Sequence, residues 1–137
     1  MDTGHWNNLP EDFIPAEWWG FVYCITRKDT GRKYIGKKQL NSYTRKKVAG
    51  RKNRKRVVKE SNWRSYTGSC DELNREIEEL GKDMFEFEVV QLCKTKGELT
   101  YAEVEHQIKL NVLTEKNEDG SRKYYNSNIM SRWFVRD

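Results

Sequence analysis

The chain contains few of the residues that build disulfide frameworks and zinc sites. Among its 137 residues are only three cysteines and two histidines. Cys24, Cys70 and Cys93 form no CxxC pair, and an odd number of cysteines suits reduced thiols in a cytosol better than a disulfide framework. With His5 and His106 as the only histidines, a zinc site of the usual spacing is not expected.

Long apolar runs are also missing. No stretch approaches the roughly 20 apolar residues that a membrane-spanning helix needs. The first residues, MDTGHWNNLPEDF, lack the basic and then apolar order of a secretory signal peptide. We therefore expect an intracellular, cytoplasmic protein without a membrane partner.

Basic residues, by contrast, are abundant in one part of the chain. Residues 27–64 hold 16 Lys and Arg against two acidic residues, Asp29 and Glu60, which gives a net charge of +14. The rest of the chain holds 10 basic and 19 acidic residues and has a net charge of −9. A polycationic block on an acidic protein normally pairs with a polyanion, and nucleic acid is the commonest one inside cells.

The length and composition predict one folded domain that spans the whole chain (1–137). Hydrophobic residues make up 36% of it, enough for a single modest core. Residues 1–17 are interpreted as an irregular arm because both prolines of the chain lie there. Residues 127–137 are interpreted as a tail, and the aromatic residues near this end are expected to pack back onto the domain. The anchors expected in the arm are Trp6, Phe13 and Ile14.

Three segments rich in aromatic and β-branched residues predict strands. They are residues 18–26 (WWGFVYCIT), 33–40 (KYIGKKQL) and 84–93 (MFEFEVVQLC). A turn that contains Asp29 and Gly31 joins the first two segments. With two helices, these strands predict an α+β fold: a small three-stranded, mostly antiparallel sheet flanked by helices.

Two segments carry the apolar periodicity of helices. Residues 69–81 begin with Ser69 as the expected N-cap and end at Gly81. The apolar face of this helix is expected at Leu73, Ile77 and Leu80. Residues 98–113 carry two apolar stripes and are expected to be covered on two sides. The stripes consist of Tyr101, Val104, Ile108 and Val112, and of Leu99, Ala102, Leu110 and Leu113.

Residues 43–64 form a basic insertion after the first hairpin. Their weak apolar periodicity allows a basic helix broken at Gly50 or a loop that orders on binding, and we expect a partly helical, mobile segment. The dense charge of residues 45–59 favours phosphate contact over a merely solvated loop. Trp63 and Tyr66 are expected to anchor the segment to the core rather than stack on bases. The predicted DNA-contacting residues are Lys38, Arg45, Lys46, Lys47, Arg51, Lys52, Arg54, Lys55, Arg56, Lys59 and Arg64.

The first hairpin resembles the GIY-YIG nuclease module. FVY, which ends at Tyr23, stands for the first motif, and YIG, which begins at Tyr34, stands for the second. Phe21 and Val22 replace the usual glycine and isoleucine, changes that a strand tolerates. YTGSCDELNREIEELGKDMFEFEVVQL, LTYAEVEHQI and YYN follow in the order of the later family motifs. The resemblance covers about residues 20–126 and is greatest to small, stand-alone phage-type members.

The resemblance implies roles for the tyrosines and their neighbours. Tyr23 becomes the general base, Tyr34 assists by positioning, and Asn126 closes the site by hydrogen bonding. An isolated phenol has a pKa near 10, so it needs a nearby positive charge to act as a base at neutral pH. Because side chains alternate along a strand, only one of Lys37 and Lys38 is expected to point at the site, and Lys37 is the first choice.

The resemblance also implies a metal-binding glutamate and an arginine. Glu103 is the best match in LTYAEVEHQI, with Glu105 as the alternative, and on a helix at most one of them can reach the hairpin. A single carboxylate leaves most coordination positions to water and phosphate, which suits Mg²⁺ or Mn²⁺. For the arginine that steadies the phosphate, Arg45 is the first choice by spacing, with Arg51 and Arg64 as alternatives.

The sequence therefore predicts a metal-dependent endonuclease that hydrolyses phosphodiester bonds of double-stranded DNA. The resemblance suggests a phage homing-type role in the cytoplasm of a host cell. One site cuts one strand, so a double-strand break needs a homodimer or two successive nicks. Two alternatives remain open: a non-catalytic DNA- or RNA-binding module with the same fold, and a structure-specific repair or recombination nuclease.

Overall fold

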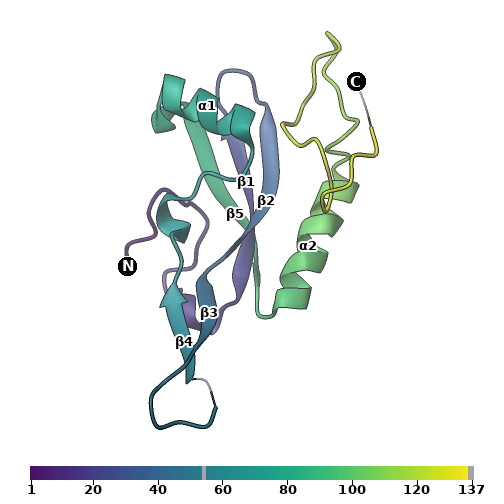
Figure 1. Ribbon diagram of the computed structural model, residues 1–137. Helices are drawn as coiled ribbons and strands as arrows, with labels where there is room; N and C mark the ends of the chain where they lie inside the picture. Colours follow the sequence, from purple (N-terminus) through teal and green to yellow (C-terminus); the bar gives the residue numbers. More distant parts are fainter. Residues whose placement is uncertain (54, 136–137) are drawn as a thin grey trace.

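Three antiparallel strands form the central sheet of the protein. The computed structural model describes residues 1–53 and 55–135, and in it β1 (Gly20–Arg27) lies between β2 (Lys33–Gln39) and β5 (Phe85–Cys93) (Figure 1). Both neighbours run antiparallel to β1. The three predicted strands are therefore confirmed.

A tight turn joins β1 to β2. Gly31 has a φ of 74°, a left-handed conformation that glycine adopts without strain. Its N–H donates to the carbonyl of Arg27 at 2.8 Å, and the Asp29 carboxylate accepts from the Arg27 guanidinium at 2.7 Å. The turn sets the register of the hairpin, in which Tyr23 lies opposite Gly36.

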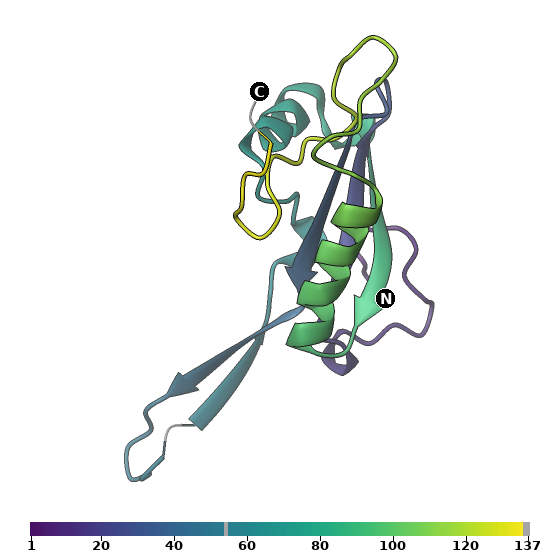
Figure 2. The same ribbon diagram turned by 90° about the vertical axis from the view of Figure 1, so that its right-hand side faces the viewer.

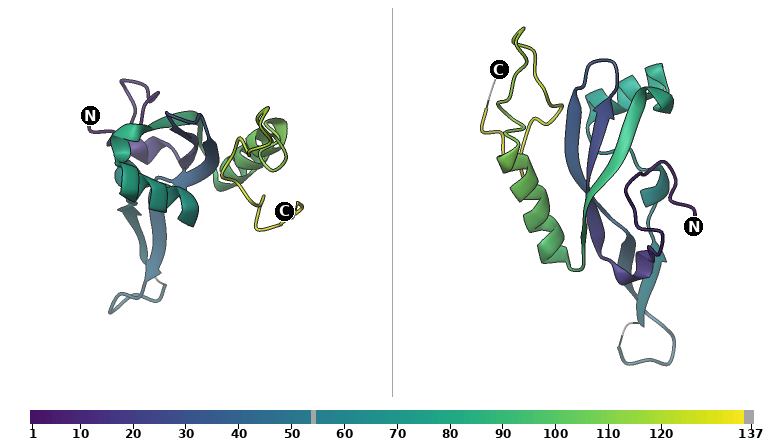
Figure 3. Two further views of the ribbon diagram at one scale, coloured as in Figure 1. Left: turned by 90° about the horizontal axis from the view of Figure 1, so that it is seen from above. Right: turned by 180° about the vertical axis from the view of Figure 1, so that it is seen from behind.

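One helix covers each face of the sheet. Figure 3 shows α1 (Asp71–Leu80) on one side and α2 (Lys96–Lys109) on the other. Successive side chains of β1 point to opposite faces. Phe21 and Tyr23 therefore enter the core on the α1 side, and Val22 enters the core on the α2 side. This arrangement confirms the predicted α+β fold.

Helix α1 buries one narrow face. Leu73 and Ile77 are buried, whereas Leu80 is 43% exposed, so the predicted apolar face is one residue too long. The predicted cap at Ser69 is wrong, because Cys70 precedes the first turn and makes no side-chain cap bond. The Ser69 hydroxyl is instead hydrogen-bonded to Tyr34.

Helix α2 is covered on one side only, in contrast to the prediction. Leu99 and Ala102 pack onto the sheet, while Tyr101 and Ile108 are 71% and 58% exposed. The Thr95 side chain caps the helix by accepting from the N–H of Glu98 at 3.1 Å. Neither of the described α-helices is long and apolar enough to cross a membrane.

The N-terminal arm packs against the α1-side core. Trp6 and Phe13 are buried as predicted, and Trp6 donates its indole N–H to the carbonyl of Trp63 at 2.5 Å. Ile14, the third predicted anchor, is 49% exposed. Trp63 is fully buried, which confirms its role as an anchor to the core. Short 3₁₀ turns lie at Pro15–Glu17, Trp63–Ser65 and Lys82–Met84.

The basic insertion forms a β-hairpin, so the prediction of a partly helical segment is wrong. β3 (Asn41–Lys46) pairs with β4 (Lys55–Glu60), and the pair projects beyond the central sheet (Figure 2). We call this hairpin with its connecting loop the β3–β4 arm. Tyr43 and Thr44 in one strand and the adjacent valines in the other favour extended structure, despite the surrounding charge.

The segment after α2 returns to the free edge of β2. The N–H of Lys33 donates to the carbonyl of Lys123 at 2.9 Å, and the N–H of Tyr125 donates to the carbonyl of Lys33 at 2.7 Å. Tyr124 and Tyr125 are buried, as expected for a tail that packs back. Trp133 is 56% exposed, so this packing does not extend to the described end of the tail.

Candidate active site

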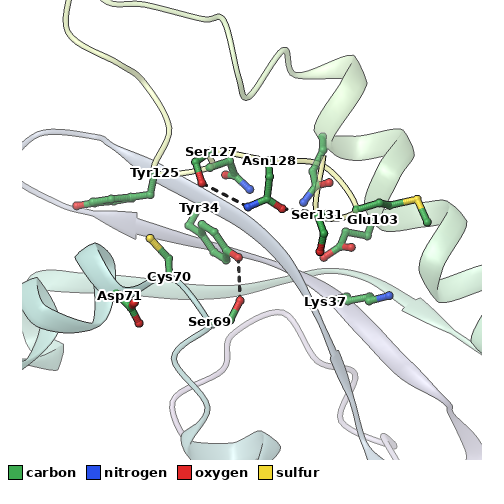
Figure 4. Close-up of a pocket in the computed structure, with 13 residues that line it drawn as sticks. Tyr34, Lys37, Ser69, Cys70, Asp71, Glu103, Tyr125, Ser127, Asn128 and Ser131 are labelled. Atoms are coloured by element: carbon green, nitrogen blue, oxygen red, sulfur yellow. Dashed lines mark hydrogen bonds between the residues drawn. The ribbon is translucent and has the colours of Figure 1, made fainter. Parts of the chain in front are cut away.

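A pocket of about 560 Å³ lies where the edge of β2 meets the loop before α1, the inner face of α2 and the C-terminal segment. Figure 4 shows side chains from all four elements around it. The residues of its wall on which the chemistry depends are Tyr34, Lys37, Ser69, Glu103, Gln107 and Asn126. Four of these, Tyr34, Lys37, Glu103 and Asn126, are site residues predicted from the sequence.

The alternation of β2 explains why the pocket wraps around its edge. Tyr34 lies opposite Ile25 and joins the α1 side of the sheet, whereas Lys37 lies opposite Val22 and joins the α2 side. Because β2 is an edge strand, side chains from both faces reach the same opening. Tyr34 thus comes from one layer of the protein, and Lys37 and Glu103 come from the other.

Tyr23 and Tyr34 are neighbours, and Tyr23 is the more deeply buried of the two. Their ring centroids are 6.2 Å apart, and Tyr34 lines the pocket with its hydroxyl 3.3 Å from that of Ser69. Tyr23 lies behind it and is only 1% exposed. Tyr66 adds a third ring on this side, with its centroid 6.1 Å from that of Tyr23.

Two glycines leave room for the Tyr23 hydroxyl and the edge of the Tyr34 ring. A Cβ atom at Gly36 would lie 2.4 Å from the Tyr23 hydroxyl oxygen and 2.9 Å from Cε2 of Tyr34. A Cβ atom at Gly68 would lie 3.1 Å from the same oxygen, and the φ of Gly68 is 88°. The glycine of the YIG motif is therefore required by the space that Tyr23 occupies.

Burial changes the protonation of both tyrosines. It raises the pKa of Tyr23 well above its usual range, and the nearby Tyr34, Tyr66 and Glu103 raise that pKa further. Burial also raises the pKa of Tyr34, although the hydrogen bond with Ser69 opposes this shift. Both phenols are therefore protonated at neutral pH in the uncomplexed protein.

Glu103 is the glutamate that faces the pocket. Burial raises the pKa of its carboxyl group, and the positive charge of Lys37 opposes that rise. The Lys37 ammonium group donates to the Thr100 hydroxyl at 3.4 Å. Glu105 does not line the pocket and lies 3.7 Å from Lys109, so the structure separates the two alternative glutamates.

Lys37 and Lys38 take opposite faces of β2, as alternation requires. Lys37 does not lie on the face of Tyr23, so its predicted place beside that phenol is wrong, and it neighbours Glu103 instead. Lys38 is on the same face as Tyr23, where its ammonium group lies 4.1 Å from the centroid of the Tyr66 ring. Burial lowers the pKa of Lys38.

Asn126 and Gln107 fix the backbone of the YIG motif. The Asn126 side chain accepts from the N–H of Ile35 at 3.1 Å and donates to the carbonyl of Ile35 at 2.8 Å. The Gln107 amide donates to the same carbonyl at 3.0 Å. Sequence reasoning missed Gln107, although its place four residues after Glu103 puts both side chains on one face of α2.

The side-chain oxygen of Gln107 is buried without a hydrogen-bond partner, although it belongs to a residue of the pocket wall. Glu103 gives the pocket a carboxylate, the type of oxygen ligand that Mg²⁺ prefers, and Gln107 in the same wall has an amide oxygen that is free of other partners. In residues 1–53 and 55–135 no three His, Cys, Asp or Glu side chains gather as a metal site. The donor set therefore fits a hard cation that keeps water and phosphate as its other ligands.

The predicted arginine is not beside the tyrosines. Arg45 lies in β3 of the β3–β4 arm, and Arg51 lies in the loop of that arm. The Arg64 guanidinium pairs with Glu60 and lies 4.4 Å from the Trp63 ring centroid. Among the described residues no arginine lines the pocket. The positively charged side chain in its wall is that of Lys37.

Most predicted DNA-contacting residues lie on the β3–β4 arm. Lys38 and Arg64 belong to the body of the domain. Arg54 lies outside the described residues, and for Lys46 the structure describes only the backbone, which continues β3. The predicted residues that are exposed on the arm are Arg45, Lys47, Arg51, Lys52, Lys55, Arg56 and Lys59.

The chain matches a known protein family over most of its length. The family model described as “Putative endonuclease segE, GIY-YIG domain” matches residues 6–129. This range includes both tyrosine strands, the β3–β4 arm, α2 and Asn126. No curated protein and no solved structure matches the chain in the corresponding searches.

Proposed function

The chain belongs to the GIY-YIG endonuclease family, and from this premise we propose that it hydrolyses phosphodiester bonds of double-stranded DNA in the pocket beside β2, with the support of Mg²⁺ or Mn²⁺. One observation carries the proposal. Tyr34, Lys37 and Glu103 come from both faces of the sheet and from distant parts of the sequence, yet they line the same pocket.

Phosphodiester hydrolysis needs a deprotonated water and a cation near the negative charge that develops on the phosphate. Lys37 supplies that cation, since its ammonium group lines the pocket and can donate to a phosphate oxygen. Tyr34 lines the pocket and orients the water through its hydroxyl, and Ser69 holds Tyr34 in position.

In this proposal Tyr23 accepts the proton of the attacking water. Because Tyr23 is 1% exposed and lies behind Tyr34, this role requires the Tyr34 ring to move aside when DNA binds. The Tyr23 hydroxyl lies at the space kept open by Gly36 and Gly68, next to the ring of Tyr34. Because burial raises its pKa, little phenolate exists at neutral pH, and the rate should rise as the pH rises. Lys38 lies on the same face of the sheet, with its ammonium group 4.1 Å from the centroid of the Tyr66 ring that neighbours Tyr23.

Glu103 and the free side-chain oxygen of Gln107 would hold the metal ion. When bound, the ion would neutralise charge on the phosphate and on the leaving oxygen. Asn126 is assigned the role of a positioning residue and not of a ligand. Its side chain bonds Ile35, which lies between Tyr34 and Gly36.

A plasmid assay tests this proposal. Supercoiled DNA is incubated with Mg²⁺ and the wild-type chain, and we expect relaxation or linearisation that EDTA prevents. Glu103→Ala should lower the rate by about 100-fold or more, as expected for loss of a metal-binding group. Glu105→Ala removes the same charge from a different face of α2 and should cut at the wild-type rate.

Equal cutting by Glu103→Ala and wild type would overturn the assignment of the site. DNA binding without cutting by either protein would indicate a non-catalytic module. Cutting of nicked or forked DNA but not of linear duplex would indicate a structure-specific nuclease. The homing-type role adds one expectation, namely that cutting of a long DNA is confined to few sites.

A further inference from the structure

The β3–β4 arm carries charge that its own fold does not need. Arg45 lies directly opposite Arg56, where side chains on neighbouring strands are about 5 Å apart and like charges are destabilising. Both residues are exposed, and a ribbon of two strands has little core of its own. The arginine pair is therefore explained by something that lies outside the chain and is negatively charged.

The two faces of the arm differ in chemistry. The pairing register places alternate residues together, which gives an arginine face and a lysine face. The arginine face consists of Tyr43, Arg45, Arg56 and Val58, with Asn41 and Glu60 at its base. The lysine face consists of Ser42, Thr44, Lys55, Val57 and Lys59.

The arginine face is ordered at its base by stacked rings. Tyr43 stacks on Trp19 with a centroid distance of 4.8 Å and an angle of 11°, and Trp19 packs against the core on the α2 side. The Arg56 guanidinium lies 4.4 Å from the centroid of the Tyr43 ring. This stack leads from the body of the domain to the arm and limits the positions that Arg56 can take, which favours directed contacts over diffuse attraction.

We propose that the β3–β4 arm lies in the major groove of B-form DNA with its arginine face toward the base edges, and that Arg45 and Arg56 recognise guanine. The major groove is about 12 Å wide and admits a two-stranded ribbon, whereas the minor groove is about 6 Å wide. Arginine pairs bidentately with O6 and N7 of guanine in that groove. The lysine face then contacts phosphates, which position the arm without reading sequence.

This inference rests on the proposed function for its choice of DNA as the partner. Duplex RNA is the less suitable polyanion, because the major groove of an A-form helix is deep and narrow. The arm projects away from the pocket, so the bases that it reads lie apart from the phosphate that is cut (Figure 2). Sequence preference is therefore expected at a fixed offset from the cut.

Binding selection from a random duplex library, in EDTA so that no strand is cut, tests the proposal. Wild-type protein should enrich duplexes with guanine at fixed positions. Arg45→Lys with Arg56→Lys keeps both charges but loses the bidentate fork, so the enrichment should fall by about 10-fold or more while affinity for random DNA changes by less than about 3-fold.

The matched control removes charge from the other face. Lys55→Ala with Lys59→Ala should weaken binding to all sequences, lower the slope of log affinity against log salt by about 2, and leave the guanine enrichment intact. Circular dichroism checks that each variant is folded. These outcomes together support recognition of guanine in the major groove by the arginine face of the arm.

Three results would overturn it: no enrichment by the wild-type protein, unchanged enrichment by the double arginine-to-lysine variant, or equal affinity for duplex RNA. Because these measurements contain no divalent metal, they do not depend on cleavage. A protein that selects guanine but never cuts would contradict the proposed function and support guanine recognition by the arm. A protein that cuts DNA without sequence preference would support the proposed function and contradict guanine recognition.

Discussion

The side-chain amide of Asn126 bonds both backbone groups of Ile35, the middle residue of the YIG motif. A side chain from a residue 91 positions later in the chain thus occupies hydrogen-bonding groups at the edge of β2. Asn126 and Ile35 are both buried, and folding removes the hydrogen bonds that the Ile35 backbone makes to water in the unfolded chain. The two bonds to Asn126 take their place. The position of Tyr34 and Gly36, on either side of Ile35, depends on this contact.

Replacing Asn126 by aspartate tests its importance for stability. Asn126→Asp keeps the shape of the side chain but places a carboxylate oxygen against the carbonyl of Ile35, so the free energy of unfolding should fall by about 2–4 kcal/mol at neutral pH. Urea unfolding measures the loss. Asn128→Asp, which changes a less buried amide of the same segment, should lose less than about 0.5 kcal/mol.

Gly36→Ala should disturb the tyrosine pair. The added methyl group would lie 2.4 Å from the Tyr23 hydroxyl oxygen, so one or both rings must move. We expect the cleavage rate to fall by at least about 10-fold, as a 1 Å displacement in a site commonly costs more than that. Gly97→Ala is the control, because its methyl group meets nothing within 4 Å and its helix gains stability. Equal rates for both variants would contradict the assigned role of Gly36.

The dependence of cleavage on pH tests the role of Tyr23. Since its pKa is raised above the usual value, the fraction of phenolate should increase with pH throughout the range from 6 to 9. The wild-type rate should therefore rise across this range under single-turnover conditions. Tyr34→Phe should be slower but keep the rise, whereas Tyr23→Phe should be slower and lose it. A rise that survives in Tyr23→Phe and disappears in Tyr34→Phe would transfer the role of base to Tyr34.

Glu103 should cost stability at neutral pH. Burial raises its pKa in the folded protein above the unfolded value, so the folded state binds more protons between these two values. Stability associated with this group is therefore present at low pH and is lost as the pH rises through its folded pKa. Glu103→Gln should unfold at higher urea concentration than wild type at pH 7, with a smaller difference at pH 4. A wild type that is more stable than the variant at pH 7 would show the sign to be wrong.

The buried oxygen of Gln107 gives a prediction for metal binding. Gln107→Leu removes this oxygen and also the bond to Ile35, so the Mg²⁺ concentration for half-maximal cleavage should rise by about 10-fold or more. Calorimetric titration of Mg²⁺ into the protein gives a readout that does not need turnover. His106→Leu, on the neighbouring position of α2 and bonded to Gln91 outside the pocket, serves as the control.

Much of the fold could be predicted from the sequence because local patterns decide it. The aromatic and β-branched residues of β1, the alternation in β5 and the turn around Gly31 allow one hairpin and one further strand to be predicted. The β3–β4 arm could not be predicted in the same way. Its charge is typical of a solvated segment, and its strand structure depends on pairing across a loop and on the stack of Tyr43 on Trp19.

The candidate site was predictable in part for a related reason. Motif order indicates Tyr34, Glu103 and Asn126, and strand alternation separates Lys37 from Lys38, whereas the choice between Glu103 and Glu105 needed the structure. The arginine could not be placed, because spacing along the chain says little across an insertion of unknown structure. The depth of Tyr23 depends on packing against Trp6 and Tyr66, which no local pattern reports.

Both outer strands of the central sheet are bonded to irregular segments of the same chain. Asn7 exchanges backbone hydrogen bonds with Phe87 and Val89 of β5, and residues 123–126 bond to β2. These contacts occupy backbone groups that would otherwise be templates for strands of other molecules, a common start of aggregation. The C-terminal segment that lines the pocket and the N-terminal arm therefore also protect a sheet of only three strands from uncontrolled self-association.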